Sequence, residues 1–75
     1  MKTMIRLTKR QIKSLEAARS EYQKMRRELV EAIQENPDNT IQNNIYRNQI
    51  LQIDKDIQRI DTSIRSCKQT IQSLT

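Results

Sequence analysis

The second half of the chain carries hydrophobic residues in an unbroken heptad pattern. Nine residues follow one another at alternating spacings of four and three: Tyr46, Ile50, Ile53, Ile57, Ile60, Ile64, Cys67, Ile71 and Leu74. A strict 3.5-residue period places one hydrophobic stripe along a helix and makes that helix supercoil left-handedly against another. The pattern therefore predicts a long helix over about residues 38–73, with this stripe as its core face.

The first half repeats the period with smaller residues. One row of residues seven apart contains Leu15, Tyr22 and Leu29, and a second contains Ala18, Met25 and Ala32. Extending the same register backwards adds Gln11, Thr8, Met4 and Met1. Thr8 with Gln11 matches a capping box, and Leu7 with Ile12 matches a hydrophobic staple. We therefore expect the first helix to cover about residues 8–35, after a basic N-terminal extension over residues 1–7.

The segment between the halves contains the only proline, Pro37, and the chain has no glycine. Proline cannot continue a helix and disfavours the α conformation of the preceding Asn36. Asn36, Asp38 and Thr40 are candidate N-caps for the second helix. A loop this short joins antiparallel helices, and the lack of glycine disfavours the tight turns of a sheet. The sequence predicts an all-α fold, an antiparallel two-helix coiled-coil hairpin that forms a single domain over residues 1–75.

The two heptad patterns agree when the hairpin is closed. Facing core positions of an antiparallel pair have a constant sum of residue numbers. That sum is 75 for Leu29–Tyr46, Met25–Ile50, Tyr22–Ile53, Ala18–Ile57, Leu15–Ile60, Gln11–Ile64, Thr8–Cys67, Met4–Ile71 and Met1–Leu74. The agreement supports the hairpin because the two patterns were assigned separately.

The hairpin has more hydrophobic residues than one seam can cover. We expect oligomer or partner packing to use Val30, Ile33, Ile41, Ile45, Leu51, Ile53, Ile57, Ile60 and Ile64. A chain of 75 residues is also too short to build a large core of its own. A homodimeric four-helix bundle would cover this surface, and docking onto the helices of another protein is the alternative.

The excess positive charge lies at one end of the chain. The formal net charge is +5, and from residue 14 onward nine basic residues balance nine acidic ones. The hairpin brings the end of the second helix beside the basic start, so the candidate anion-binding residues are Lys2, Arg6, Lys9, Arg10, Lys13, Arg65 and Lys68. An acidic protein, nucleic acid, anionic lipid and simple solubility are four explanations for this cluster. No aromatic residue lies among these cations to stack on bases, which favours an acidic protein.

Charged residues along the middle of both helices match intrahelical ion pairs. Pairs at spacings of three or four are Glu21–Lys24, Lys24–Glu28, Arg27–Glu31 and Asp61–Arg65. Asp54, Asp56 and Asp61 fall on positions outside the predicted stripe. We expect these residues to form a solvated face.

The chain lacks the residues on which catalysis usually depends. It has no histidine, no glycine and one cysteine, so we expect no Cys/His metal site, no phosphate-binding loop, no cofactor and no enzymatic activity. Cys67 cannot form an intramolecular disulfide, and no apolar run is long enough for a membrane span or a signal peptide. A cytoplasmic location is the corresponding expectation.

The function predicted from the sequence is that of a small interaction module. An adaptor, inhibitor, regulator or chaperone of this kind would act by helix-face packing, with its basic end against an acidic partner. The alternative is a dimeric regulatory protein that binds nucleic acid through the same basic cluster.

Overall fold

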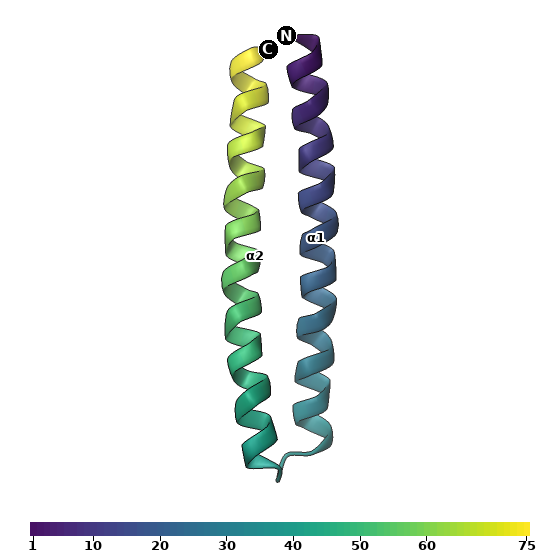
Figure 1. The fold of residues 1–75 in the computed structure, drawn as a ribbon, viewed down its shortest axis with the longest axis vertical. Coiled ribbons are helices and arrows are strands. Elements are labelled where there is room, and N and C mark those ends of the chain that lie inside the picture. Colours follow the sequence, from purple (N-terminus) through teal and green to yellow (C-terminus); the bar gives the residue numbers. More distant parts are fainter.

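The computed structural model describes residues 1–75 and contains two helices joined by a short loop. Helix α1 runs from Lys2 to Glu35 and helix α2 from Thr40 to Leu74. The helices lie side by side and antiparallel, with both termini at one end and the loop at the other (Figure 1). The backbone measures 56 × 14 × 11 Å. The all-α hairpin predicted from the sequence is confirmed.

Helix α1 begins earlier than the capping pattern at Thr8 predicts. The amide of Ile5 donates to the carbonyl of Met1 at 3.0 Å, so the first helical turn forms at the start of the chain. Thr8 Oγ1 donates to the carbonyl of Met4 at 2.7 Å, one turn back inside the helix. The hydroxyl of Thr8 is therefore not an N-cap, and residues 2–7 are the first turns of α1.

Asn39 is the N-cap of α2. Its side-chain Oδ1 accepts a hydrogen bond from the backbone amide of Gln42 at 3.2 Å. This geometry satisfies one of the free amides at a helix start. The sequence predicts three other candidates for this cap, Asn36, Asp38 and Thr40, and none of them is the N-cap in the structure. The prediction was wrong because several polar residues of this segment suit a cap equally well.

The side chain of Asn43, on α2, forms hydrogen bonds to the backbone of the loop. Its Nδ2 donates to the carbonyl of Asn36 at 2.8 Å and to that of Pro37 at 3.4 Å. Both acceptors follow the last turn of α1, where backbone carbonyls lack helical partners. Asn43 is the most buried residue of the chain, at 1% exposure, and its Oδ1 has no hydrogen-bond partner. A polar side chain in the core row thus joins the two helices at the loop.

The buried core is narrow and belongs to α2. Ile53, Ile64 and Cys67 are the buried hydrophobic residues, and α1 has no buried residue. The remaining members of the α2 stripe are half-buried, as predicted for a core face that one helix covers in part. Such a core buries little apolar surface per residue.

The second predicted seam row of α1 is only partly covered by α2. Its members Ala18 and Ala32 are half-buried, whereas Met4, Gln11 and Met25 are exposed. On the other edge of the seam, Ile5, Ile12, Arg19 and Ile33 are half-buried, and Arg19 and Arg26 bond to Asp61 and Asp54 of α2. Met4, Gln11 and Met25 therefore lie at the rim of the interface, and their pairings with α2 residues stay predictions.

Two ion pairs between the helices explain these arginines. Arg19 Nη1 lies 2.7 Å from Asp61 Oδ1, and Arg26 Nε lies 2.7 Å from Asp54 Oδ1. The pairs are one heptad apart on both helices, and we call them the Arg–Asp ladder. The intrahelical pairs of the structure are Arg19–Glu16 at 3.9 Å and Arg59–Asp56 at 4.0 Å, in place of those predicted from spacing.

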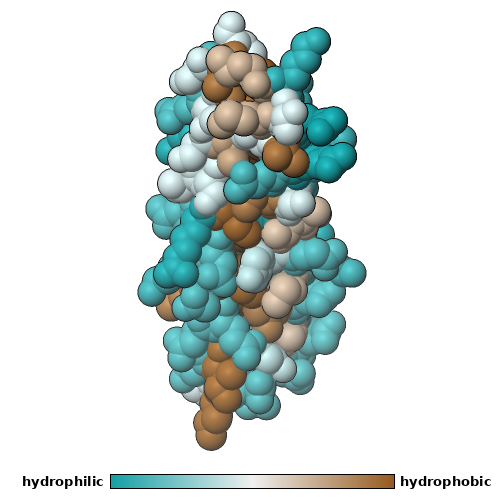
Figure 2. Space-filling model, turned by 45° about the horizontal axis from the view of Figure 1, so that its top comes forward, coloured by the Kyte–Doolittle hydropathy of each residue, from teal (hydrophilic) through white to brown (hydrophobic).

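The isolated hairpin exposes a large surface for its mass. Its accessible area is 5922 Å², whereas a compact 9.0 kDa monomer exposes about 4,850 Å². The large hydrophobic residues that remain exposed are Met1, Met4, Leu7, Met25, Ile41, Ile45 and Leu51. Figure 2 shows hydrophobic residues in a band along one face between hydrophilic margins. Neither helix contains an apolar stretch able to cross a membrane.

Candidate functional site

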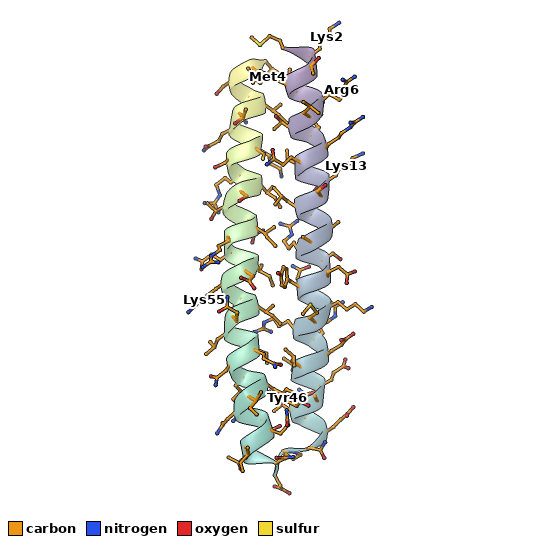
Figure 3. All side chains as sticks on the ribbon, viewed as in Figure 1. Lys2, Met4, Arg6, Lys13, Tyr46 and Lys55 are labelled. Atoms are coloured by element: carbon orange, nitrogen blue, oxygen red, sulfur yellow. The ribbon has the colours of Figure 1, made fainter.

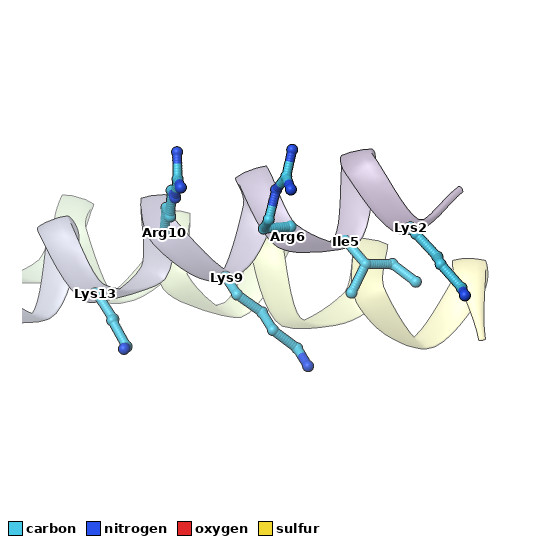
Figure 4. A pocket seen from close by; sticks show the side chains of 6 residues that line it. All are labelled: Lys2, Ile5, Arg6, Lys9, Arg10 and Lys13. Atoms are coloured by element: carbon cyan, nitrogen blue, oxygen red, sulfur yellow. The ribbon is translucent and has the colours of Figure 1, made fainter.

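The sequence-predicted basic residues meet at the end of the hairpin that holds both termini. Residues of α1 line one open depression there: Lys2, Ile5, Arg6, Lys9, Arg10 and Lys13. Their charged ends point away from the helix, with Arg6 and Arg10 on one side and the lysines on the other (Figures 3 and 4). On α2, Arg65 and Lys68 line a neighbouring depression that also contains Ile64, Arg19 and Asp61. We call the seven basic residues of the two helices the cationic surface.

No member of the cationic surface forms an ion pair. The ion pairs of the molecule involve three of its fourteen Lys and Arg residues, namely Arg19, Arg26 and Arg59. Residues 1–15 and 62–75, which form this end, contain no acidic residue. Seven positive charges therefore gather at this end without forming an ion pair. Asp61, which lines the depression with Arg65 and Lys68, bonds to Arg19 instead.

The charge on the side of the seam that holds the Arg–Asp ladder changes from the loop end to the terminal end. Near the loop and in the middle, Arg26 meets Asp54 and Arg19 meets Asp61. One heptad further towards the termini, the corresponding positions are Ile12 and Lys68. Lys68 stands where the ladder has an aspartate, and Ile12 stands where it has an arginine. This side of the seam is therefore neutralised along the ladder and positive beyond it.

The ladder also has an electrostatic effect on one of its own members. The hydrogen bond that Arg26 donates to Asp54, and secondly the negative charge of Asp54, raise the pKa of Arg26 above the ordinary value of arginine. The stabilisation from this shift would be lost as pH rises through the raised pKa of Arg26. Arg26 therefore stays charged throughout the neutral and mildly alkaline range.

The start of α1 places positive charge where a helix favours negative charge. Its first turn contains no acidic residue, and its N-cap, Met1, makes no side-chain hydrogen bond. Lys2 lies in this turn. A cation at a helix N-terminus opposes the helix dipole and costs about 0.3–1 kcal/mol. Stability alone does not explain the charge at this end.

Few of the residues predicted to pack against a partner remain available. Ile53 and Ile64 are buried inside the hairpin, and Val30, Ile33, Ile57 and Ile60 are half-buried. The three that are exposed are Ile41, Ile45 and Leu51, at 81%, 46% and 60%. Met4, Leu7 and Met25 are also exposed, although the sequence pattern places Met4 and Met25 in the seam and Leu7 in a hydrophobic staple.

A shallow groove of about 520 Å³ follows one side of the seam in the loop-side half of the hairpin. Its apolar lining is Tyr22, Met25, Leu29, Ala32, Tyr46 and Ile53. Glu28, Gln49, Gln52 and Asp56 form its polar rim. Both tyrosines of the chain line this groove, where a ring packs against apolar neighbours and the hydroxyl reaches water. The groove is an apolar surface of the kind that accepts protein side chains.

Comparison with family models, with curated proteins and with solved structures gives no match for this chain. The two surfaces of the hairpin, the cationic surface and the apolar groove, are therefore the features that bear on its function. The lone thiol of Cys67 is buried, and no three Cys, Asp or Glu side chains gather as metal ligands. The cationic surface and the apolar groove are suited to binding through charge and contact.

Proposed function

We propose that this chain is a small non-catalytic interaction module that packs helix faces against protein and uses the cationic surface to contact acidic residues of its partner. The observation that carries the proposal is the change along the Arg–Asp edge. Asp54 and Asp61 neutralise Arg26 and Arg19, whereas Lys68 and the α1 cations beyond them form no ion pair. Unpaired like charges repel one another, so an anionic partner would stabilise this end.

The spacing of the cations fits an acidic helix. Lys2, Arg6, Lys9 and Lys13 follow one another at steps of four, three and four residues. These steps place one cation per helical turn of about 5.4 Å in a single backbone stripe of α1, from which the lysine side chains lean to one side and that of Arg6 to the other (Figure 4). A partner helix with carboxylates at the same steps can face this row for its whole length.

Nucleic acid is the less favoured ligand. Single-stranded binding relies on aromatic side chains that stack on bases, and the two tyrosines lie in the groove, away from the cationic surface. Phosphate contacts alone give sequence-independent binding that weakens steeply with salt. The alternative of a dimeric nucleic-acid-binding regulator is tested in the same experiment.

Fluorescence anisotropy with three labelled probes tests the proposal. The probes are a helical peptide with glutamates at steps of four, three and four, a scrambled peptide of equal composition, and duplex DNA. We expect the chain to bind the stepped peptide several-fold more tightly than the scrambled one. Equal affinity for both peptides would contradict the proposed recognition of an acidic helix, and tighter binding to the duplex would favour the alternative.

Two sets of charge-reversal substitutions identify the surface that binds the stepped peptide. The triple variant Lys9→Glu, Arg10→Glu, Lys13→Glu removes three charges of the cationic surface. The control Lys24→Glu, Arg27→Glu, Lys55→Glu changes net charge equally at exposed positions outside it. We expect only the first variant to lose binding of the stepped peptide. Equal losses in both variants would show that net charge, and not this surface, attracts the peptide.

A further inference from the structure

One face of the hairpin gathers most of the exposed large hydrophobic residues. Met25 lines the groove, and Met4 lies three heptads before it on the same side of α1. Leu7 lies three heptads before the groove residue Glu28, and Ile45 one heptad before Gln52. We call this side the groove face. The residues Ile41 and Leu51 fall outside its heptad positions.

The size of the groove face fits a protein interface. The backbone extents of 56 Å and 14 Å give a face of about 780 Å², and a stable protein interface buries about 800 Å² on each partner. The isolated hairpin also exposes about 1,070 Å² more surface than a compact monomer of its mass. A second elongated hairpin has the right dimensions to cover this face.

The distribution of charge along the hairpin selects the orientation of such a pair. The terminal end carries seven basic residues and no acidic one. The loop end, residues 28–46, carries four acidic residues and no basic one: Glu28, Glu31, Glu35 and Asp38. The ends are separated by most of the 56 Å length, far beyond the screening length of about 8 Å in physiological salt. Two copies side by side in the same direction would bring like charges together at each end, and opposite directions would bring the positive end beside the negative one.

We propose that two copies of this chain pack groove face against groove face in opposite directions, forming a four-helix bundle. End-for-end overlap brings Lys2 of one copy level with Glu35 of the other, because these residues bound α1. Leu7 then comes level with residue 30, beside Ala32 and Ile45 of the second copy. The two apolar ends of the groove face thus cover each other.

This arrangement separates two binding activities on one small chain. The groove face would be covered by the second copy, while the lysines of the cationic surface lie on the Arg–Asp side of the seam and remain open. The inference shares with the proposed function the requirement that a helix face packs against protein. It does not depend on an acidic partner.

Distances between spin labels distinguish the two orientations. Thr3→Cys and Ala17→Cys, each combined with Cys67→Ala, place one label near the end of α1 and one near its middle. In the proposed bundle the two labels at position 3 lie about 46 Å apart along the axis, and those at position 17 lie within one turn. Short distances at both positions would overturn the orientation. The absence of a dipolar signal would overturn the dimer, provided that sedimentation of the unaltered chain also shows a monomer.

Lysine substitutions test the face. We expect Met25→Lys and Leu7→Lys each to weaken dimerisation by about tenfold or more, since a charge would enter an apolar contact. The control Leu51→Lys alters a residue that is more exposed than Met25 but lies outside the groove face, and it should leave the dimer intact. Circular dichroism confirms that each variant folds. A dimer unaffected by both groove-face variants would overturn the inference, whereas a dimer that fails to bind the acidic peptide would contradict the proposed function alone.

Discussion

Arg19 and Asp61 are joined across the two helices by a 2.7 Å contact, and the same contact recurs between Arg26 and Asp54. Both pairs have residue numbers that add to 80, so they specify one register. A slip of one heptad would break both pairs and form only one new Arg–Asp pair, Arg19–Asp54 or Arg26–Asp61. Asn43 also opposes such a slip, because its side chain donates hydrogen bonds to the carbonyls of Asn36 and Pro37, which follow α1. The ladder and the loop together fix how the helices align.

A double-mutant cycle should reveal coupling between Arg19 and Asp61. Arg19→Gln and Asp61→Asn remove one charge each, and both side chains are partly exposed, at 32% and 42%. We expect a coupling free energy of about 0.2–1 kcal/mol that decreases in high salt. Urea unfolding of the two single variants, the double variant and the parent chain measures it. Coupling that is absent at low salt would show that this contact does not stabilise the hairpin.

Alanine substitutions at Ile53 and Leu51 should differ sharply in their effect on stability, although the sequence pattern predicts both as packing residues. Ile53 is 5% exposed and Leu51 is 60% exposed. Ile53→Ala should destabilise the hairpin by about 2–4 kcal/mol, because it removes buried methyl groups and leaves a cavity. Leu51→Ala should change stability by less than about 0.5 kcal/mol. Thermal and urea unfolding measure both, and equal losses would contradict the burial pattern.

Asn43→Asp should make stability depend on pH. The new carboxyl would be buried beside the carbonyl oxygens of Asn36 and Pro37, which disfavours its charged form and raises its pKa in the folded state. Because the pKa of this carboxyl is higher in the folded state, its contribution to folding stability is fully present below its unfolded-state pKa of about 3.9 and is lost as the pH rises. At neutral pH we expect a loss of about 1–3 kcal/mol against the parent chain.

The measurement is the difference in urea midpoint between Asn43→Asp and the parent chain at several pH values. The difference should shrink on acidification, when the protonated carboxyl can donate a hydrogen bond as the amide does. Asn43→Ala serves as the control, because it removes the donor without adding a titrating group. The same pH dependence in both variants would rule out this explanation.

Asn39→Ala and Thr8→Ala should separate the observed helix start from the predicted one. Asn39 caps α2, so its replacement should cost about 1 kcal/mol. Thr8 lies inside α1 and its hydroxyl bonds back to Met4. Alanine has the higher helix propensity, so Thr8→Ala should be neutral or slightly stabilising. A loss at Thr8 like that at Asn39 would place the start of α1 at Thr8 after all.

Lys2→Glu should stabilise the hairpin while weakening its binding of acidic peptide. The substitution places a negative charge in the first turn of α1, which now has none. We expect a gain of about 0.3–1 kcal/mol at low salt that declines as salt is added. Unfolding and anisotropy on the same sample test both parts. Unchanged peptide affinity would remove Lys2 from the cationic surface.

The sequence was sufficient to predict the hairpin and the position of its charge. The stripe from Tyr46 to Leu74 and the break at Pro37 are strong local signals, because hydrophobic period and proline chemistry depend on few distant contacts. The four buried residues of the structure all lie in the core rows of that helix. The basic residues could likewise be grouped once the chain was folded back on itself.

The seam of α1 could not be predicted from hydrophobicity. Arg19 and Arg26 lie at the edge of the seam, where Asp61 and Asp54 of the opposite helix accept hydrogen bonds from their guanidinium groups. This pairing is visible only when the register is known, since the partners are 42 and 28 residues apart. A search for charged residues at matching heptad steps on both helices would have found the ladder.

Every buried residue of the hairpin belongs to α2, and α1 has none. The two helices should therefore tolerate mutation unequally. Saturation mutagenesis scored by folding should find most α1 positions permissive, with intolerant sites concentrated at a few α2 positions around Ile53 and Ile64. A chain divided in this way can diversify the surface of one helix while the other preserves the fold.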